Sequence, residues 1–157
     1  MDKRKVIVSG RPRSGTSMMM KILDLSGYKC LRDMDWEEKI RPGRKNEYFY
    51  EHRGLVHEGN ISLLDGYDAG KVMPKALPNL PPDRVVVIWM DRDRESVVAS
   101  QAAYGRDKMI KRDLYEDYDQ WDVEKLLEPF AHVRLSYEAL TQVVNEHKRK
   151  LSANPLP

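Results

Sequence analysis

Gly10-Arg11-Pro12-Arg13-Ser14-Gly15-Thr16-Ser17 is the segment from which the fold of this chain is predicted most directly. It follows a β-branched run at residues 6–8. The residues after it carry apolar side chains at helical spacing, namely Met18, Met19, Ile22, Leu23 and Leu25. The order is therefore a strand, a tight loop and a helix over residues 14–26. Backbone N–H groups of such a loop and the N-terminus of the following helix together favour a bound phosphate or sulfate.

The octet departs from the Walker A pattern, G-x-x-x-x-G-K-[ST], at one position. Thr16 stands where that pattern has lysine, and the nearest cation is Arg13, inside the loop. ATPases and GTPases use the lysine on the β- and γ-phosphates and the Ser or Thr hydroxyl on magnesium. The missing lysine therefore weakens the interpretation as a nucleotide-hydrolysing enzyme.

A second segment with a clear pattern is the run Val-Val-Val-Ile-Trp-Met at residues 85–90. A continuously apolar, β-rich run is typical of a strand that is covered on both faces of a parallel sheet. Asp93 is a suitable N-cap for a helix over residues 94–104. Arg92 closes the strand, and Ser100 follows eight residues later, two turns into that helix.

The other segments predict shorter elements. Gly27 suits the end of the first helix, and the irregular, charged residues 28–45 predict a surface loop or lid. A helix is expected at 55–64 and a short strand at 71–73, and no regular structure is expected around Pro74, Pro78, Pro81 and Pro82. Helical pieces are expected at 108–127 and a half-buried strand at 131–136. The last helix carries Leu140, Val143 or Val144, and Leu151, and is expected to end at Asn154-Pro155.

Together these elements predict an α/β protein, a three-layer αβα sandwich with a mainly parallel sheet of the P-loop NTPase-like type. The chain of 157 residues suits one domain, 1–157. A formal net charge of +2 gives no support for nucleic-acid binding. Cys30, the one cysteine, cannot form an internal disulfide and is expected to be a small buried residue. The sequence shows neither a signal-peptide pattern nor a membrane span, so a cytoplasmic protein is expected.

The segment Pro12-Arg13-Ser14-Gly15-Thr16-Ser17 resembles the loop of sulfotransferases, P-[KR]-S-G-T-[ST], which holds the 5′-phosphosulfate of the donor PAPS. The resemblance implies that the Arg13 guanidinium, the Gly15 amide and the hydroxyls of Ser14, Thr16 and Ser17 surround that group. Fixed donors aimed at the leaving oxygen would stabilise the charge that develops there. Arginine can serve this purpose without a metal, because its guanidinium is always charged and offers a planar fork to oxyanions.

Arg92 and Ser100 resemble the Arg and Ser, eight residues apart, with which sulfotransferases hold the 3′-phosphate of PAPS. The segment Leu135-Ser136-Tyr137-Glu138-Ala139-Leu140 is similar to the family's Y-E-D-L segment, with Ala139 in place of the acid. The resemblance implies that Tyr137 lies near the adenine. A core aromatic residue with a satisfied hydroxyl is the alternative.

Two segments before the buried strand offer candidates for the general base. Asn46-Glu47-Tyr48-Phe49-Tyr50-Glu51 resembles the N-P-K-G-Y-F-E segment of some bacterial sulfotransferase-like proteins, which nominates Glu51. Residues 71–78 resemble the segment in which cytosolic sulfotransferases carry K-T-H-L-P, with Ala76 in place of the catalytic histidine. The hypothesis is therefore Glu51 as base and Lys71 or Lys75 as charge stabiliser, with ordinary surface charges as the alternative.

The resemblance implies a sulfotransferase that moves a sulfuryl group from PAPS, without a metal, to a hydroxyl or amine of a small acceptor, leaving PAP. Larger family members have a C-terminal R-K-G segment at the 3′-phosphate, which this sequence lacks. Three explanations stay open: Arg94, Arg106 or another cation replaces it, the affinity for the donor is reduced, or catalysis is lost. Two alternatives stay open. One is a P-loop kinase or NTPase with a magnesium-binding acid such as Asp91, and the other is a PAP- or PAPS-binding module without transfer activity. The acceptor pocket is expected in residues 32–53 and 105–122, and neither the acceptor nor the oligomeric state is readable.

Overall fold

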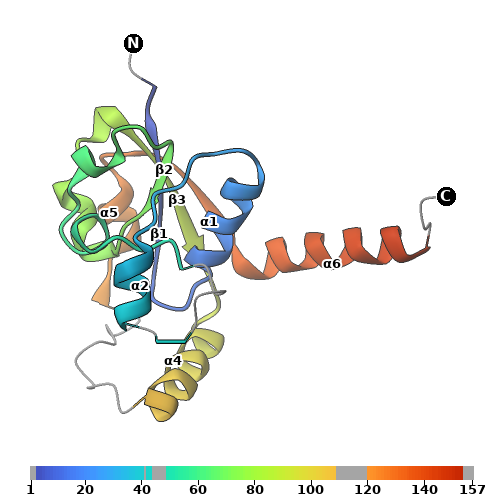
Figure 1. The fold of residues 1–157 in the computed structure, drawn as a ribbon. Coiled ribbons are helices and arrows are strands. Elements are labelled where there is room, and N and C mark those ends of the chain that lie inside the picture. Colours follow the sequence, from blue (N-terminus) through green and yellow to red (C-terminus); the bar gives the residue numbers. More distant parts are fainter. Residues whose placement is uncertain (1–2, 41, 44–48, 109–119, 154–157) are drawn as a thin grey trace.

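A parallel β-sheet forms the centre of the protein, for which a computed structural model describes residues 3–40, 42–43, 49–108 and 120–153 (Figure 1). Its four strands pair in the order β2-β1-β3-β4, and all three pairings are parallel. The strands are β1 (Lys5–Gly10), β2 (Ala69–Lys71), β3 (Val85–Asp91) and β4 (Ala131–Ser136). The α/β class and the parallel sheet that the sequence predicts are confirmed.

Helices cover both faces of this sheet. The helices of the described residues are α1 (Thr16–Leu25), α2 (Met34–Ile40), α3 (Arg53–Val56), α4 (Arg94–Lys108), α5 (Val123–Leu127) and α6 (Tyr137–Ala153), of which α1 packs on one face and α3 and α5 on the other. Successive residues of a strand point to opposite faces. Ile7 accordingly belongs to a buried cluster with residues of α3 and α5, and Val8 to a second cluster with residues of α1. This arrangement is compatible with a three-layer sandwich.

The strand register places the candidate residues along one edge of the sheet. Gly10 at the end of β1 lies opposite Met90 of β3, and Met90 lies opposite Leu135 of β4. In a parallel sheet all strands finish at the same edge. The loop after β1, Arg92 after β3 and Tyr137 after β4 therefore share that edge, which is where ligands bind in open α/β sheets.

The edge strand β4 is less covered than the alternating sequence predicts. Most of its residues are exposed, and Val133 keeps 44% of its surface in solvent. Figure 1 shows that α6, which follows β4, extends away from the sheet. The prediction of a half-buried strand is therefore wrong in its burial, although the strand occupies residues 131–136 as expected.

Two further predictions are corrected. Residues 28–45 contain the helix α2, because Asp33 accepts a hydrogen bond from the Trp36 N–H at 3.0 Å and so caps its first turn. The helix expected at residues 55–64 is split into α3 and a 3₁₀ turn, Ile61–Leu64. Gly59 separates the two with a φ of 70°, which a continuous helix cannot contain.

The proline-rich segment is more ordered than expected. It forms two 3₁₀ turns, Pro74–Asn79 and Pro82–Arg84, each with a proline at its start, where the missing N–H costs no hydrogen bond. Strand β2 begins two residues before the predicted one. Of the helical pieces expected at 108–127, the structure has α5, and residues 109–119 and the predicted stop at Asn154-Pro155 lie outside its described part.

The described residues include no helix with the length and apolar composition to cross a membrane. Cys30 is half-buried rather than fully buried, and its thiol donates to the carbonyl oxygen of Met20 at 3.7 Å. Burial, followed by the charges of Asp24 and Asp68, raises the pKa of this thiol to about 11. The thiol is therefore protonated at neutral pH, in keeping with a packing role.

Candidate functional site

The loop between β1 and α1 bends sharply across the end of β3. A Cβ atom at Gly10 would lie 2.7 Å from the carbonyl oxygen of Met90, so only glycine allows this approach. The Ser14 N–H donates to the carbonyl oxygen of Arg11 at 3.0 Å and closes the turn. Arg13 and Gly15 adopt left-handed conformations, with φ of 73° and 96°. Alternation of this kind turns successive N–H groups to one side, as in anion-binding concavities.

The start of α1 and the hydroxyl of Ser14 offer donors to a ligand. Gly15, the N-cap, has no side chain that could satisfy the first N–H groups of the helix. Ser14 is 1% exposed, and within the described part of the chain its Oγ has no hydrogen-bond partner. A buried hydroxyl without a partner is costly. The loop therefore fits an oxyanion, which would accept from both the hydroxyl and the helix N-terminus.

Side chains at the end of β3 converge on this loop. Arg92 donates from Nη1 to the carbonyl oxygen of Arg13 at 2.9 Å. Arg13 in turn donates from its Nε to the Oγ of Ser100, on α4, at 3.0 Å. The resemblance implies that Arg13 and Ser100 hold different ends of one ligand, whereas in the structure the two side chains are hydrogen-bonded to each other. The two guanidinium groups thus lie on the same side of the sheet.

Tyr137 connects the loop to Arg92. The Arg92 guanidinium carbon lies 4.3 Å from the centre of the Tyr137 ring, a cation–π contact. A Cβ atom on Gly15 would lie 2.5 Å from the Tyr137 Cδ2, so the ring also packs against the loop. The ring is half-buried, so the alternative of a core aromatic residue does not describe it. The expected place near the adenine stays a prediction.

Glu51 and Lys71 form a buried ion pair beside the last residue of the loop. The Lys71 Nζ lies 2.7 Å from the Glu51 Oε1, and the two side chains are 6% and 13% exposed. The same ammonium donates to the Ser17 Oγ at 3.1 Å and to the Phe49 carbonyl oxygen at 2.7 Å. The alternative of two independent surface charges does not apply to this pair.

Lys75 lies elsewhere. It is exposed on the 3₁₀ turn after β2, near His57. Burial of the His57 ring, followed by the positive charge of Lys75, lowers the pKa of that imidazole. Ala76, which stands where the resemblance has the catalytic histidine, is 1% exposed in the core cluster with Leu77. The structure thus brings Lys71, and not Lys75, to the loop.

Asp91, the acid that a magnesium-dependent enzyme would use, is held by an arginine. Both of its carboxylate oxygens accept from Arg134, at 2.7 and 3.0 Å, and one also accepts from the Trp89 Nε1 at 3.1 Å. Arg134 contacts Glu124 of α5 as well. Within the described residues no group of three or more His, Cys, Asp and Glu side chains could hold a metal ion.

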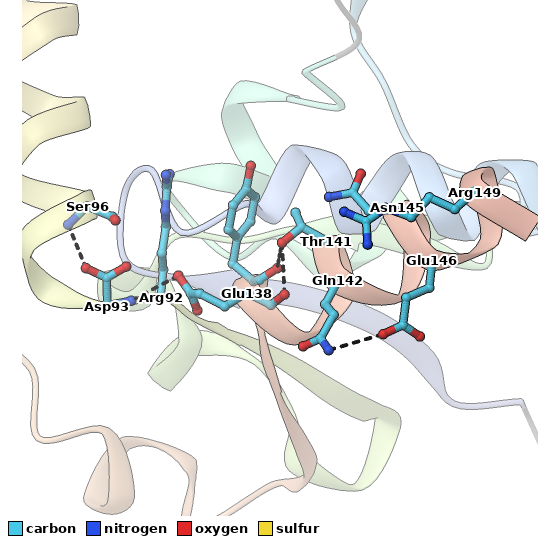
Figure 2. Close-up of a pocket in the computed structure, with 10 residues that line it drawn as sticks. Arg92, Asp93, Ser96, Glu138, Thr141, Gln142, Asn145, Glu146 and Arg149 are labelled. Atoms are coloured by element: carbon cyan, nitrogen blue, oxygen red, sulfur yellow. Dashed lines mark hydrogen bonds between the residues drawn. The ribbon is translucent and has the colours of Figure 1, made fainter.

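A pocket of about 440 Å³ opens beside Arg92 and Tyr137 (Figure 2). Its other walls come from the start of α4 and from one face of α6, with the side chains of Asp93, Ser96, Glu138, Thr141, Gln142, Asn145, Glu146 and Arg149. The Asp93 N–H donates to the Glu138 Oε1 at 3.4 Å and so joins two of these walls. Sequence reasoning missed this face of α6, although Thr141 and Asn145 follow Tyr137 at intervals of four residues, which place them on one side of a helix.

Sequence reasoning also missed Glu37 and Arg32, which lie near Glu51. Glu37 on α2 is only 4% exposed, and its carboxylate accepts from the Arg32 Nε at 2.8 Å and from the Glu51 N–H at 2.9 Å. A buried carboxylate in such a short helix has no sequence signal of its own, because its partners are defined only by the fold.

Comparison with known proteins adds no family to this description. No protein-family model matches the chain, and no curated protein matches it.

Proposed function

We propose that the protein is a PAPS-dependent sulfotransferase of the P-loop type, built as an αβα sandwich, that acts on a hydroxyl or amine of a small-molecule acceptor. The observation that carries the proposal is the convergence of the loop with Arg92 and Ser100 at one edge of the sheet. Two arginines, a buried serine hydroxyl and a helix N-terminus at one edge suit a ligand with two separate anionic groups.

The residues present fit the donor. The orphaned Ser14 Oγ and the turn that only Gly10 and Gly15 allow would hold the 5′-phosphosulfate, with Thr16 and Ser17 beside it. Arg92, with Ser100, would hold the 3′-phosphate, and Tyr137, whose ring lies against Arg92, would lie near the adenine. PAPS supplies the activated sulfuryl group. The adjoining pocket along α6 gives room for the remainder of the nucleotide.

Cationic side chains take the two places where a nucleotide-hydrolysing P-loop enzyme uses magnesium. In the Walker A pattern the hydroxyl at the position of Ser17 binds the metal, whereas here it accepts from the Lys71 ammonium. The acid at the end of the neighbouring strand, Asp91, is neutralised by Arg134. These pairings favour transfer supported by fixed protein charges over the kinase or NTPase alternative.

The roles of the remaining residues follow from their positions. Glu51 would accept the proton of the attacking hydroxyl or amine, because it is a carboxylate joined to the loop through Lys71. Lys71 would contribute positive charge near Ser17, where negative charge develops on the leaving oxygen. Lys75, which no contact described above joins to the loop, is left out of the proposed machinery.

The test is calorimetric titration with PAP and with its 3′-dephosphorylated analogue, with and without magnesium. We expect binding of PAP that does not depend on magnesium and exceeds the binding of ATP and GTP. In Arg92→Ala the loss of a charge-assisted hydrogen bond should weaken PAP roughly ten- to a hundredfold and leave the analogue nearly unchanged. Arg84→Ala, in an exposed arginine before β3, is the matched control.

Equal losses for both ligands in Arg92→Ala would remove the 3′-phosphate assignment, and magnesium-dependent ATP binding would favour the kinase or NTPase. A protein that binds PAP but transfers no sulfuryl group to any of a panel of phenols, alcohols and amines would be the binding module.

A further inference from the structure

The segment that carries Glu51 is held in a strained conformation. Tyr50 has a φ of 54°, a left-handed value that a bulky aromatic residue rarely adopts. Its side chain is 3% exposed, and its hydroxyl donates to the Asp24 Oδ2 on α1 at 2.7 Å. Strain of this kind persists only where the surroundings over-determine the backbone, and it clusters at functional sites.

The backbone of Glu51 itself is fixed on both sides by the start of α2. Its N–H donates to the buried Glu37 Oε1 at 2.9 Å, and its carbonyl oxygen accepts from the Asp33 N–H at 3.0 Å. Glu37 is in turn oriented by Arg32, whose Nε donates to the second carboxylate oxygen at 2.8 Å. With its backbone held in this way, the Glu51 side chain reaches the Lys71 ammonium.

We propose that Glu37, oriented by Arg32, is a positioning residue that aims the Glu51 carboxylate at Lys71 and so at Ser17 of the loop. The physical reason is that Glu37 offers the Glu51 N–H a charged, buried acceptor that cannot rotate away while Arg32 holds it. A role of this orientation in catalysis rests on the proposed function, whereas the orientation of Glu51 by Glu37 does not.

The experiment uses the double variant Arg32→Met/Glu37→Met. Replacing both members of a buried ion pair by apolar residues of similar size is often neutral for stability. The fold should therefore survive while Glu51 loses its acceptor. The readout is reductive methylation of Lys71 by formaldehyde, followed by mass spectrometry. In the wild-type protein the buried, hydrogen-bonded Lys71 should react much more slowly than exposed Lys29.

In the double variant we expect Lys71 to react about tenfold faster, since local opening exposes it. The thermal midpoint should fall only by the few degrees that an unpaired buried N–H costs, and the affinity for PAP should stay close to wild type. The matched control is Arg53→Met/Glu58→Met. These two residues have the same types as Arg32 and Glu37 but are exposed, so the rate of Lys71 methylation should stay unchanged. A double variant that stays folded with Lys71 still protected would overturn the proposal.

A second variant and a second readout keep the two proposals apart. Glu37→Gln retains shape and one acceptor oxygen but not the charge that Arg32 orients, so an intermediate Lys71 rate is expected, and a wild-type rate counts against positioning. Release of p-nitrophenol from p-nitrophenyl sulfate, with the sulfuryl group passing to the 5′-phosphate of PAP, reads transfer. If Lys71 becomes reactive while wild-type transfer is absent, the proposed function fails and the positioning stands.

Discussion

Gly15 carries two separate constraints at the scale of a single residue. Its φ of 96° disfavours any side chain, and a Cβ atom there would meet the Tyr137 ring at 2.5 Å. Gly66 has only the first constraint, since its φ is 79° and a Cβ atom would have nothing within 4 Å. The two glycines therefore separate the cost of a left-handed backbone from the cost of displacing the ring.

We expect Gly66→Ala to lower the free energy of unfolding by about 1 kcal/mol, the cost of a left-handed alanine. Gly15→Ala should lower it further, because Tyr137 must move, and with the ring displaced from Arg92 the affinity for PAP should fall. Urea unfolding and calorimetry measure the two effects. Equal stability losses and an unchanged PAP affinity in Gly15→Ala would show that the ring is not a support of the loop.

At the scale of one element, the start of α4 depends on Asp93. The Asp93 Oδ1 accepts from the Ser96 N–H at 2.8 Å, which confirms the predicted N-cap. Hydrogen bonds from Ser96 are the first cause of a lowered pKa at this carboxyl, and the nearby Arg92 adds to the effect. The charged form of Asp93 is therefore favoured in the folded protein.

The sign of the pH dependence follows. A carboxyl whose pKa is lower in the folded than in the unfolded state stabilises the fold above its unfolded pKa of about 3.9, and loses that contribution as the pH falls through the folded pKa. Asp93→Asn keeps a capping oxygen but cannot titrate. Wild type should therefore lose more stability than Asp93→Asn between pH 7 and pH 3 in urea unfolding. Parallel profiles would contradict this, and exposed Asp65→Asn serves as control.

At the scale of the whole molecule, Arg134 connects the last strand to the rest. It joins β4 to the end of β3 through Asp91 and contacts α5 through Glu124. The outer strand has little other cover, because most of its residues are exposed and α6 extends away from it. The attachment of β4 thus depends on its ladder to β3 and on this arginine.

Arg134→Gln should cost about 1 kcal/mol or less, since its side chain is partly exposed and solvent screens the pair. That cost should appear locally. Amide hydrogen exchange should become about fivefold faster in β4 and stay unchanged in β1, at the centre of the sheet. Uniform acceleration across all strands would show that the arginine stabilises the protein as one unit instead. His132→Gln, on exposed β4, controls for substitution in the strand.

The local chemistry of the chain determined the elements that the sequence predicts well. These elements depend on residues that are close in the chain: a β-branched run, a glycine-rich turn or apolar residues at helical spacing. Such local patterns predict β1, the loop and α1, and also β3 and the helix that Asp93 caps. The same local reasoning missed α2 within a charged segment and overlooked that Gly59 divides a helix, because there the capping contact and the backbone turn outweigh composition.

How the candidate residues meet depends on contacts between distant parts of the chain. The contact of Arg13 with Ser100 spans 87 positions, and that of Lys71 with Ser17 spans 54, so no local pattern specifies either distance. The parallel sheet brings the strand ends to one edge, and buried Glu37 selects the conformation of Glu51 through a backbone hydrogen bond. The sequence alone determined which groups could bind an anion. The packing of the sheet decided which of these groups lie together, because long-range contacts form only when the strands align.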